Sequence, residues 1–297
     1  MVRSSPASLF FLGVSCAAAA TISLACDGPR NPSGSTGPPQ SANSQPALPR
    51  TAEHAQGSSP PRKAKEEPSE DLAAPLGRHW TTQLPHGTQQ LVVVTSQSWA
   101  ATDGELRRYA LFDSAWRQTG ATARVVLGKS GLGWGRGLHA AEATGAQKRE
   151  GDGKAPAGLF LLNKSYGHGP GARLQTGLEH TSVTPSWRCV DDVKSTHYGE
   201  LLDAASVNQD WKSAEKLQRS DPLYEIIVLV EHNGAHERGA GSCIFLHTWR
   251  FLEDQPSVPR PTVGCTAMAR ESLLVLVEWL KPGAVLAQLP AAEVKRD

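Results

Sequence analysis

The composition of the chain changes abruptly near residue 78, and this change limits how much of it can fold. Residues 27–78 contain 10 of the 21 prolines and no Phe, Trp or Tyr, whereas all eight tryptophans lie after residue 79. A segment without aromatic anchors buries too little apolar surface to offset the conformational entropy lost on folding. We therefore expect one folded domain over residues 79–297, preceded by a flexible segment.

The first 25 residues are typical of an export signal. Arg3 precedes an apolar stretch over residues 9–20, which is too short for a membrane-spanning helix. The stretch leads to Ser23-Leu24-Ala25-Cys26, which resembles the lipidation motif of bacterial lipoproteins with its leucine displaced by one position. We predict a signal peptide over residues 1–25, lipidation of Cys26 and an exported protein on the periplasmic face of a bacterial membrane. The alternative is ordinary signal-peptidase cleavage near Ala25, which releases a soluble protein.

Residues 26–78 form the predicted lipid-anchored tether. A flexible coil of about 50 residues has a mean span of roughly 35–45 Å, so the domain would act at a distance from its membrane anchor. The whole chain balances 30 Lys and Arg against 29 Asp and Glu, which gives a formal net charge of +1. A nucleic-acid binder that relies on a basic surface carries a larger positive charge, so we expect no nucleic-acid partner.

The pattern of apolar residues after residue 79 predicts a mainly β domain with a few helices. Strand-like runs occur at residues 91–95, 123–127, 224–230 and 242–246, and glycine-rich turns separate many of them. Apolar residues spaced i, i+3, i+4 and i+7 predict a helix over residues 270–280, which Pro282 and Gly283 end. Residues 284–289 are predicted to return as a closing strand.

Two suggestive motifs fail on inspection. Gly128-Lys129-Ser130 lacks the earlier glycine of a phosphate-binding loop, because position 123 is Ala. His232 and His236 have the spacing of a helical zinc site, but Asn233-Gly234 between them predicts a turn. We therefore interpret both segments as loops without a phosphate or a metal ion.

Cys265 and His247 are the pair of residues that best fits a catalytic site, with a thiol nucleophile and a base. His247 ends an apolar strand, and Cys265 lies 18 residues later, just before the predicted helix. A thiol near a helix N-terminus is expected to have a lowered pKa, and a nearby histidine can take its proton. Gly264 allows close backbone approach, so that successive N–H groups can face an oxyanion.

Four sequence blocks resemble the catalytic domain of the L,D-transpeptidase family of cell-wall enzymes. The first block is residues 128–137, and the second is Gly-Asp-Gly-Lys-Ala-Pro-Ala-Gly-Leu-Phe at residues 151–160. The third combines residues 189–192 with 210–215, and the fourth combines 241–247 with 261–265. The second and fourth blocks, in this order and spacing, carry most of the resemblance.

The resemblance implies a function and a role for each residue of the constellation. Cys265 would be the nucleophile, His247 the base, and the backbone carbonyl of Thr248 would orient the imidazole. The N–H groups of Gly264 and Cys265 would make the oxyanion hole. The implied fold is a β-sandwich-like catalytic domain with a packed helix, and the implied partners are peptidoglycan stem peptides, which are cross-linked through a thioester without any metal or organic cofactor.

The chain departs from the family pattern at two positions beside the nucleophile. Val263 stands where the family often has His, and Ala267 stands where it often has Arg. Alternatives therefore remain open: an L,D-carboxypeptidase or amidase at the same site, or a non-catalytic wall-binding lipoprotein. A metal site built from Cys243, His247 and Cys265 is disfavoured, because residues four apart on a strand lie roughly 13 Å apart.

Cys189 and Cys243 have two interpretations. Free cysteines are most often small buried apolar residues, and we favour that role here. An exported protein can also pair them in a disulfide, but their separation in sequence does not place them within reach of each other.

Overall fold

The computed structural model describes residues 74–142 and 144–297. Within them the chain is mainly β with few helices, as predicted. The predicted signal peptide over 1–25, the lipidation of Cys26 and nearly all of the tether lie outside the described residues. None of the described helices combines the length and apolar character needed to cross a membrane.

Eleven strands form one large mixed sheet in the order β4-β5-β14-β1-β2-β3-β13-β12-β11-β6-β7, and three more form a small sheet in the order β10-β8-β9. The strands of the large sheet are β1 (Gln90–Ser96), β2 (Asp103–Phe112), β3 (Ala115–Val126), β4 (Leu132–Trp134), β5 (Ala155–Leu162), β6 (Lys164–Gly167), β7 (Glu179–Ser182), β11 (Ile226–Leu229), β12 (Phe245–Thr248), β13 (Thr266–Met268) and β14 (Ala284–Pro290). The small sheet contains β8 (Trp187–Val190), β9 (Leu201–Asp203) and β10 (Ala214–Lys216).

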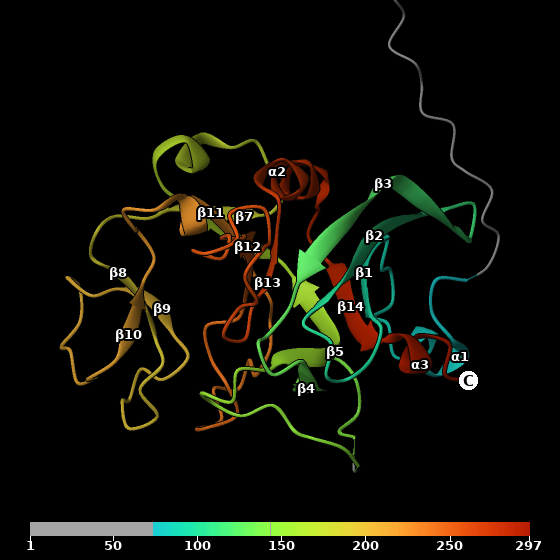
Figure 1. Cartoon of the computed structure of the whole chain (residues 1–297), viewed down its shortest axis with the longest axis horizontal. Coiled ribbons are helices and arrows are strands. Elements are labelled where there is room, and N and C mark those ends of the chain that lie inside the picture. The colour runs from blue at the N-terminus through green and yellow to red at the C-terminus, as the bar shows by residue number, and fades with distance from the viewer. Residues whose placement is uncertain (1–73, 143) are drawn as a thin grey trace, which may run out of the picture. The chain divides into compact units, whose positions relative to one another are not determined.

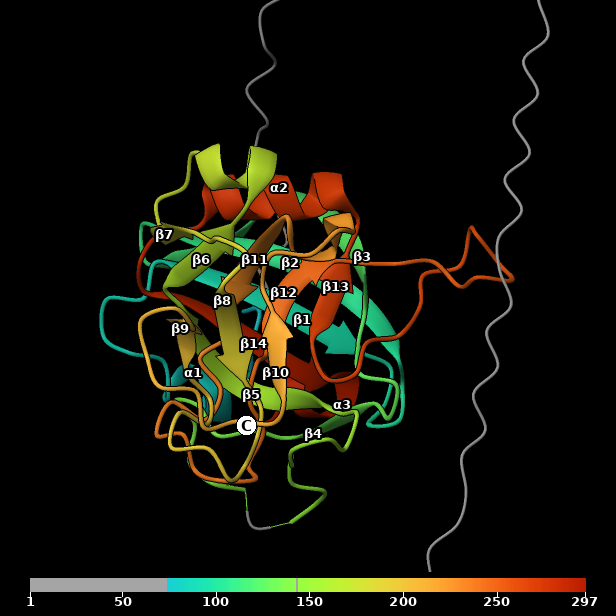
Figure 2. The same ribbon diagram turned by 90° about the vertical axis from the view of Figure 1, so that its left-hand side faces the viewer.

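The helices within residues 74–142 and 144–297 are few and short. They are α1 (Arg78–Thr81), α2 (Arg270–Trp279) and α3 (Ala291–Val294), with 3-10 turns η1 (Gly169–Arg173) and η2 (Pro222–Tyr224). Helix α2 matches the predicted helix, and its Leu273, Leu276 and Val277 are buried against the sheet. It lies across one end of the strands in two perpendicular views (Figures 1 and 2).

The folded part begins earlier than the predicted boundary at residue 79. Leu76 is 2% exposed and belongs to the apolar core together with Trp80, which is fully buried. The N–H of Gly77 donates to the carbonyl of Val294 at 2.8 Å. Residues 75–78 were assigned to the tether because their composition is that of the linker, but long-range contacts with the C-terminal segment hold them in the domain.

The described residues contain two apolar clusters. The larger one joins β1, β5, β14 and α2, and Leu91, Phe160 and Leu286 are among its fully buried members. The smaller one lies between the large and the small sheet and includes Tyr224, Phe245 and Cys265. Strand β11 separates them, because Ile226 packs in the larger cluster and Ile227 in the smaller.

Candidate active site

Two neighbouring strands bring Cys265 and His247 to one pocket. Strands β12 and β13 pair in parallel, with His247 opposite Ala267. Cys265 comes directly before β13, and its Sγ accepts a hydrogen bond from the N–H of Phe245 at 3.3 Å. Both Cys265 and His247 line a pocket of about 390 Å³. The structure thus brings together the two residues that the sequence singled out, although they are 18 positions apart.

A backbone hydrogen bond fixes the His247 ring. It is 5% exposed, and its Nδ1 lies 2.7 Å from the carbonyl oxygen of Thr248. Because a carbonyl only accepts, this contact places the proton on Nδ1 and leaves Nε2 as an acceptor. Burial lowers the pKa of His247 to about 4, so the imidazole is neutral at pH 7. The contact with Thr248 is the one that the family resemblance implied.

Cys265 is less activated than the sequence predicted. The thiol is 4% exposed, and burial raises its pKa well above the ordinary value. The predicted lowering by a helix N-terminus was wrong, because β13 separates Cys265 from the first residue of α2, Arg270. Sγ donates to the carbonyl oxygen of Cys243 at 3.4 Å, and no hydrogen bond joins it to His247 within the described part of the chain.

The turn before Cys265 is closed by hydrogen bonds of its own. The N–H of Gly264 donates to Thr262 Oγ1 at 3.2 Å, and that hydroxyl donates to the carbonyl of Cys265 at 2.6 Å. Gly264 has a φ of +155°, which other residues rarely adopt. The N–H of Gly264 is therefore engaged within the turn, and the predicted oxyanion hole is not open at this position.

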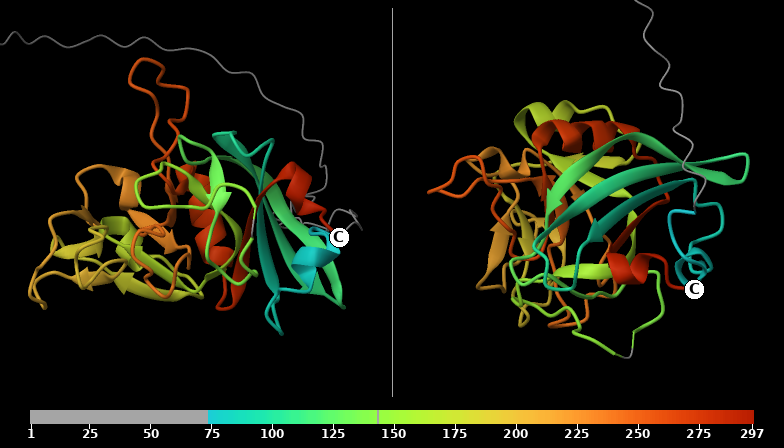
Figure 3. Two further views of the ribbon diagram at one scale, coloured as in Figure 1. Left: turned by 90° about the horizontal axis from the view of Figure 1, so that it is seen from below. Right: turned by 45° about the vertical axis from the view of Figure 1, so that its right-hand side comes forward.

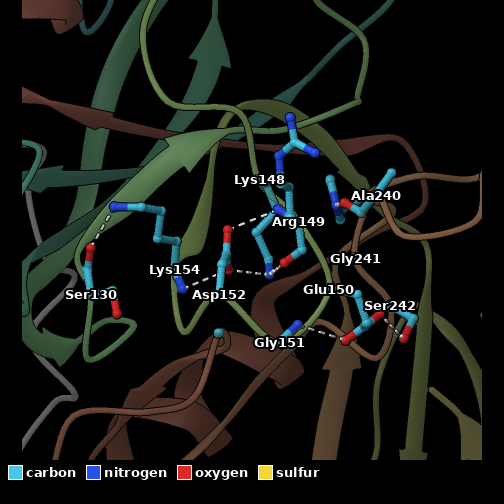
Figure 4. A network of polar contacts seen from close by, with 12 residues as sticks. Ser130, Lys148, Arg149, Glu150, Gly151, Asp152, Lys154, Ala240, Gly241 and Ser242 are labelled. Carbon is cyan, nitrogen blue, oxygen red and sulfur yellow. Dashed lines mark hydrogen bonds and ion pairs between the residues drawn. The ribbon is translucent and has the colours of Figure 1, made fainter. Parts of the chain in front are cut away.

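A buried lysine lies behind this turn. The Lys148 side chain is 3% exposed, and its Nζ donates to Asp152 Oδ1 at 2.7 Å and to the carbonyl of Arg149 at 2.6 Å (Figure 4). A Cβ added to Gly264 would lie 3.9 Å from that Nζ. The ammonium charge partly opposes the effect of burial on the pKa of Cys265. The sequence alone does not indicate Lys148, because nothing local marks it except Asp152 four residues later.

Glu150, the residue directly before the second sequence block, holds the start of the fourth block. Its Oε2 accepts hydrogen bonds from Ser242 Oγ and from the hydroxyl of Tyr198, each at 2.7 Å, and the Ser242 contact is visible in Figure 4. The same hydroxyl accepts from the N–H of Gly241 at 3.1 Å. These contacts fix the residues that lead into β12, and therefore the position of His247.

The preferred interpretation of Cys189 and Cys243 was wrong, because the two form a disulfide. Their Cα atoms lie 5.8 Å apart, although 54 positions separate them in sequence. The bond links β8 of the small sheet to the residue whose carbonyl accepts from the Cys265 thiol. Cys243 has a φ of +56°, an unusual backbone conformation that orients this carbonyl. Among the described cysteines, Cys265 alone is free.

The first block reaches the pocket, whereas the third does not. The N–H of Lys129 donates to the carbonyl of Thr262 at 2.8 Å, and Lys129 lines the pocket. In the third block, Asp192 accepts from the N–H groups of Lys194 and Lys212, which lowers its pKa. Such contacts order the loops of the small sheet and place no side chain of this block in the pocket.

The histidine pair at 232 and 236 lies in a loop, as expected. His232 Nδ1 accepts from the N–H of Arg136 at 3.1 Å, and Nε2 lies 2.9 Å from the carbonyl of Ala240. Burial lowers its pKa to about 4. Both ring nitrogens have protein partners, and the described residues hold no group of three or more side chains suited to a metal ion.

The pocket combines apolar walls with positive charge. Its walls are formed by Leu223, Tyr224, Trp249, Leu252, Pro261, Val263 and Ala267. Three cationic side chains, Lys129, Arg250 and Arg260, line it as well, and no carboxylate side chain does so among the described residues. Much of this lining comes from the loop over residues 249–264, the orange loop that projects from the domain in the left view of Figure 3.

Comparison with known proteins identifies no relative of the chain. No family model matches the chain, and neither the curated proteins nor the solved structures include a significant match. The chemical interpretation of the site therefore depends on its own geometry and on the motif blocks.

Proposed function

We propose that the chain is a cysteine acyltransferase that cross-links peptidoglycan stem peptides as an L,D-transpeptidase. One observation carries the proposal: a free thiol and an imidazole fixed through Nδ1 line the same pocket from adjacent strands. A nucleophile, a base and a group that orients the base are the minimum required for acyl transfer. The motif blocks supply the substrate class.

At rest, both reacting groups are neutral. The pKa of the Cys265 thiol is raised and that of the His247 imidazole is lowered, so the thiolate forms only as attack begins. Rotation about Cα–Cβ moves Sγ from the Cys243 carbonyl into the pocket, where Nε2 accepts the thiol proton. The ammonium of Lys148, buried behind the turn, favours the negative charge that develops there.

The acyl group is then transferred in two steps. Sγ bonds to the carbonyl carbon of the third residue of a stem tetrapeptide, and the imidazolium returns its proton to the departing nitrogen of D-alanine. The resulting thioester is attacked by the side-chain amine of a second stem, which forms the new amide bond and restores the thiol. Attack by water instead would make the protein an L,D-carboxypeptidase.

A second candidate is a non-catalytic wall-binding protein. It is favoured by the position of Cys265, whose buried Sγ is engaged with the backbone of Phe245 and Cys243. This candidate predicts binding to peptidoglycan without any covalent intermediate on Cys265.

The test is to incubate the full chain with disaccharide tetrapeptides and to identify products by mass spectrometry. Cross-linked dimers that have lost one D-alanine are expected, and they should be absent for Cys265→Ala and His247→Gln. His232→Gln is the matched control, because His232 is also buried and has the same lowered pKa of about 4 but does not line this pocket. Trimmed monomers alone would indicate hydrolysis, and wall binding without any product would support the second candidate.

A further inference from the structure

The pocket beside Cys265 carries positive charge that the protein does not neutralise. Arg250 shares Asp221 with Arg219, since its Nη2 lies 3.2 Å from one carboxylate oxygen of Asp221. Lys129 and Arg260 have no side-chain hydrogen bond or ion pair within the described residues, and both side chains are exposed. Two of the three pocket cations are thus available to an external group.

Backbone hydrogen bonds hold the main chain of both residues beside the pocket that Cys265 lines. Lys129 donates its N–H to the carbonyl of Thr262 at 2.8 Å, and Thr262 Oγ1 bonds to the carbonyl of Cys265. Arg260 donates its N–H to the carbonyl of Arg250 at 2.7 Å, which closes the base of the 249–264 loop. Lys129 therefore extends from backbone that is bonded to the turn carrying Cys265, and Arg260 extends from the base of the loop that leads into this turn.

The rest of the lining identifies the kind of ligand that fits. Trp249, Leu252 and Val263 offer apolar surface, and Val263 is 68% exposed. Ala267, opposite His247 on β13, is fully buried and adds no charge. Apolar walls beside unpaired cations suit a ligand with an uncharged body and an anionic end.

We propose that Lys129 and Arg260 form a carboxylate-binding subsite that selects acyl donors whose leaving group carries a free α-carboxylate. This inference deepens the proposed function and rests on it for the identity of the donor. The attraction of an anionic group to Lys129 and Arg260 depends only on the pocket, so it can be tested without enzymatic turnover. Lys129 and Arg260 act here as specificity-determining residues, and neither takes part in the proton transfers.

The test compares two alkylating reagents of nearly equal size, iodoacetate and iodoacetamide, on the full chain. Each forms a carbon–sulfur bond at Cys265 and releases iodide, while the thiol proton passes to solvent. Peptide mass spectrometry measures the rate at that residue. An exposed ion pair contributes about 0.2–1 kcal/mol, so each of Lys129→Gln and Arg260→Gln should lower the iodoacetate-to-iodoacetamide rate ratio about threefold. The double variant should lower it about tenfold.

The controls separate local charge from folding and from net charge. Iodoacetamide rates should stay within about twofold in all variants, because a neutral reagent is insensitive to the subsite. Arg117→Gln removes one charge from β3 outside the pocket and should leave the ratio unchanged. Added salt should lower the wild-type ratio toward that of the double variant.

The outcomes separate this inference from the proposed function. An unchanged rate ratio in the double variant would overturn the subsite, whether or not the protein forms cross-linked dimers. A lowered ratio without any muropeptide product would support the subsite and count against the transpeptidase. When dimers form, a donor amidated at its terminal carboxylate should lose about tenfold in kcat/KM with the wild type and little with the double variant.

Discussion

The two apolar clusters on either side of β11 differ in chemistry. The larger one is built almost entirely from aliphatic and aromatic side chains, such as Leu91, Phe160 and Leu286. The smaller one contains a thiol, a disulfide and the phenol of Tyr224, whose hydroxyl donates to Glu215 at 2.7 Å. Burial raises the pKa of Tyr224 and of Glu215. The difference indicates that the thiol and the disulfide lie on one side of the sheet only, whereas buried ionisable groups occur on both, since His139 and His232 contact Phe160 of the larger cluster.

Replacing Cys265, the proposed nucleophile, should produce the largest effect, and this effect should be on turnover and not on stability. Cys265→Ala is expected to lower turnover by at least about 10⁴-fold, because no other group in the pocket can form the thioester. Stability should change by only about 1 kcal/mol, since the change removes one buried sulfur. Product analysis and urea unfolding measure the two effects. Retained turnover would show that the chemistry does not depend on Cys265.

Removing the disulfide should lower the stability of the protein and raise the reactivity of Cys265. Closing a loop of 54 residues is expected to contribute about 4 kcal/mol to the free energy of unfolding. The double variant Cys189→Ala/Cys243→Ala should lose this contribution, and alkylation of Cys265 should become faster because the Cys243 backbone is no longer held. A reducing agent should reproduce the change in the wild type and do nothing to the double variant. Unchanged stability would mean that the small sheet is held by its packing alone.

Acid should destabilise the protein through its buried neutral histidines. His247 and His232 each have a pKa lowered to about 4 in the folded state, so the unfolded chain binds more protons between pH 6.5 and 4. The stability that depends on these neutral histidines is fully present above pH 6.5. It is lost as the pH falls from 6.5 through about 4, and the loss is on the order of 3 kcal/mol for each histidine. Urea midpoints across this range measure the loss. In His247→Gln, the loss of stability between pH 6.5 and 4 should be smaller by the contribution of one histidine. A pH dependence identical to that of the wild type would contradict a lowered pKa of His247.

A matched pair of substitutions on β11 should give the smallest change in stability and should compare the two clusters directly. Ile226→Val and Ile227→Val remove the same methylene from adjacent buried positions, and each should cost about 1 kcal/mol. Only Ile227→Val opens space in the cluster that contains Cys265, so only this variant should change the rate of its alkylation. Equal alkylation rates in the two variants would show that the clusters are not separate.

The sequence predicted the elements that have a strong apolar pattern of their own. The runs at 91–95 and 284–289 lie within β1 and β14, and the periodic helix lies at α2. The run at 224–230 was too long, because Tyr224 belongs to the 3-10 turn η2 and β11 starts at Ile226. Local periodicity marks the centre of an element better than its ends.

The sequence singled out His247 and Cys265, and the structure places both in one pocket, but the groups around them could not be predicted. His247 and Cys265 carry chemistry by residue type, and the motif blocks mark them. Lys148, Lys129 and Arg260 reach the site through contacts between distant segments, such as the bridge between Gly128 and Thr262. The raised pKa of Cys265 follows from burial beside β13, which only the three-dimensional arrangement shows.

Strand β14 also constrains when the domain can fold. It lies between β5 and β1 and pairs with both, although it is the last strand in the sequence. During synthesis, β1 and β5 leave the ribosome well before the strand that joins them. Contacts of such large sequence separation form slowly, so the nascent domain stays open until its final strand has emerged.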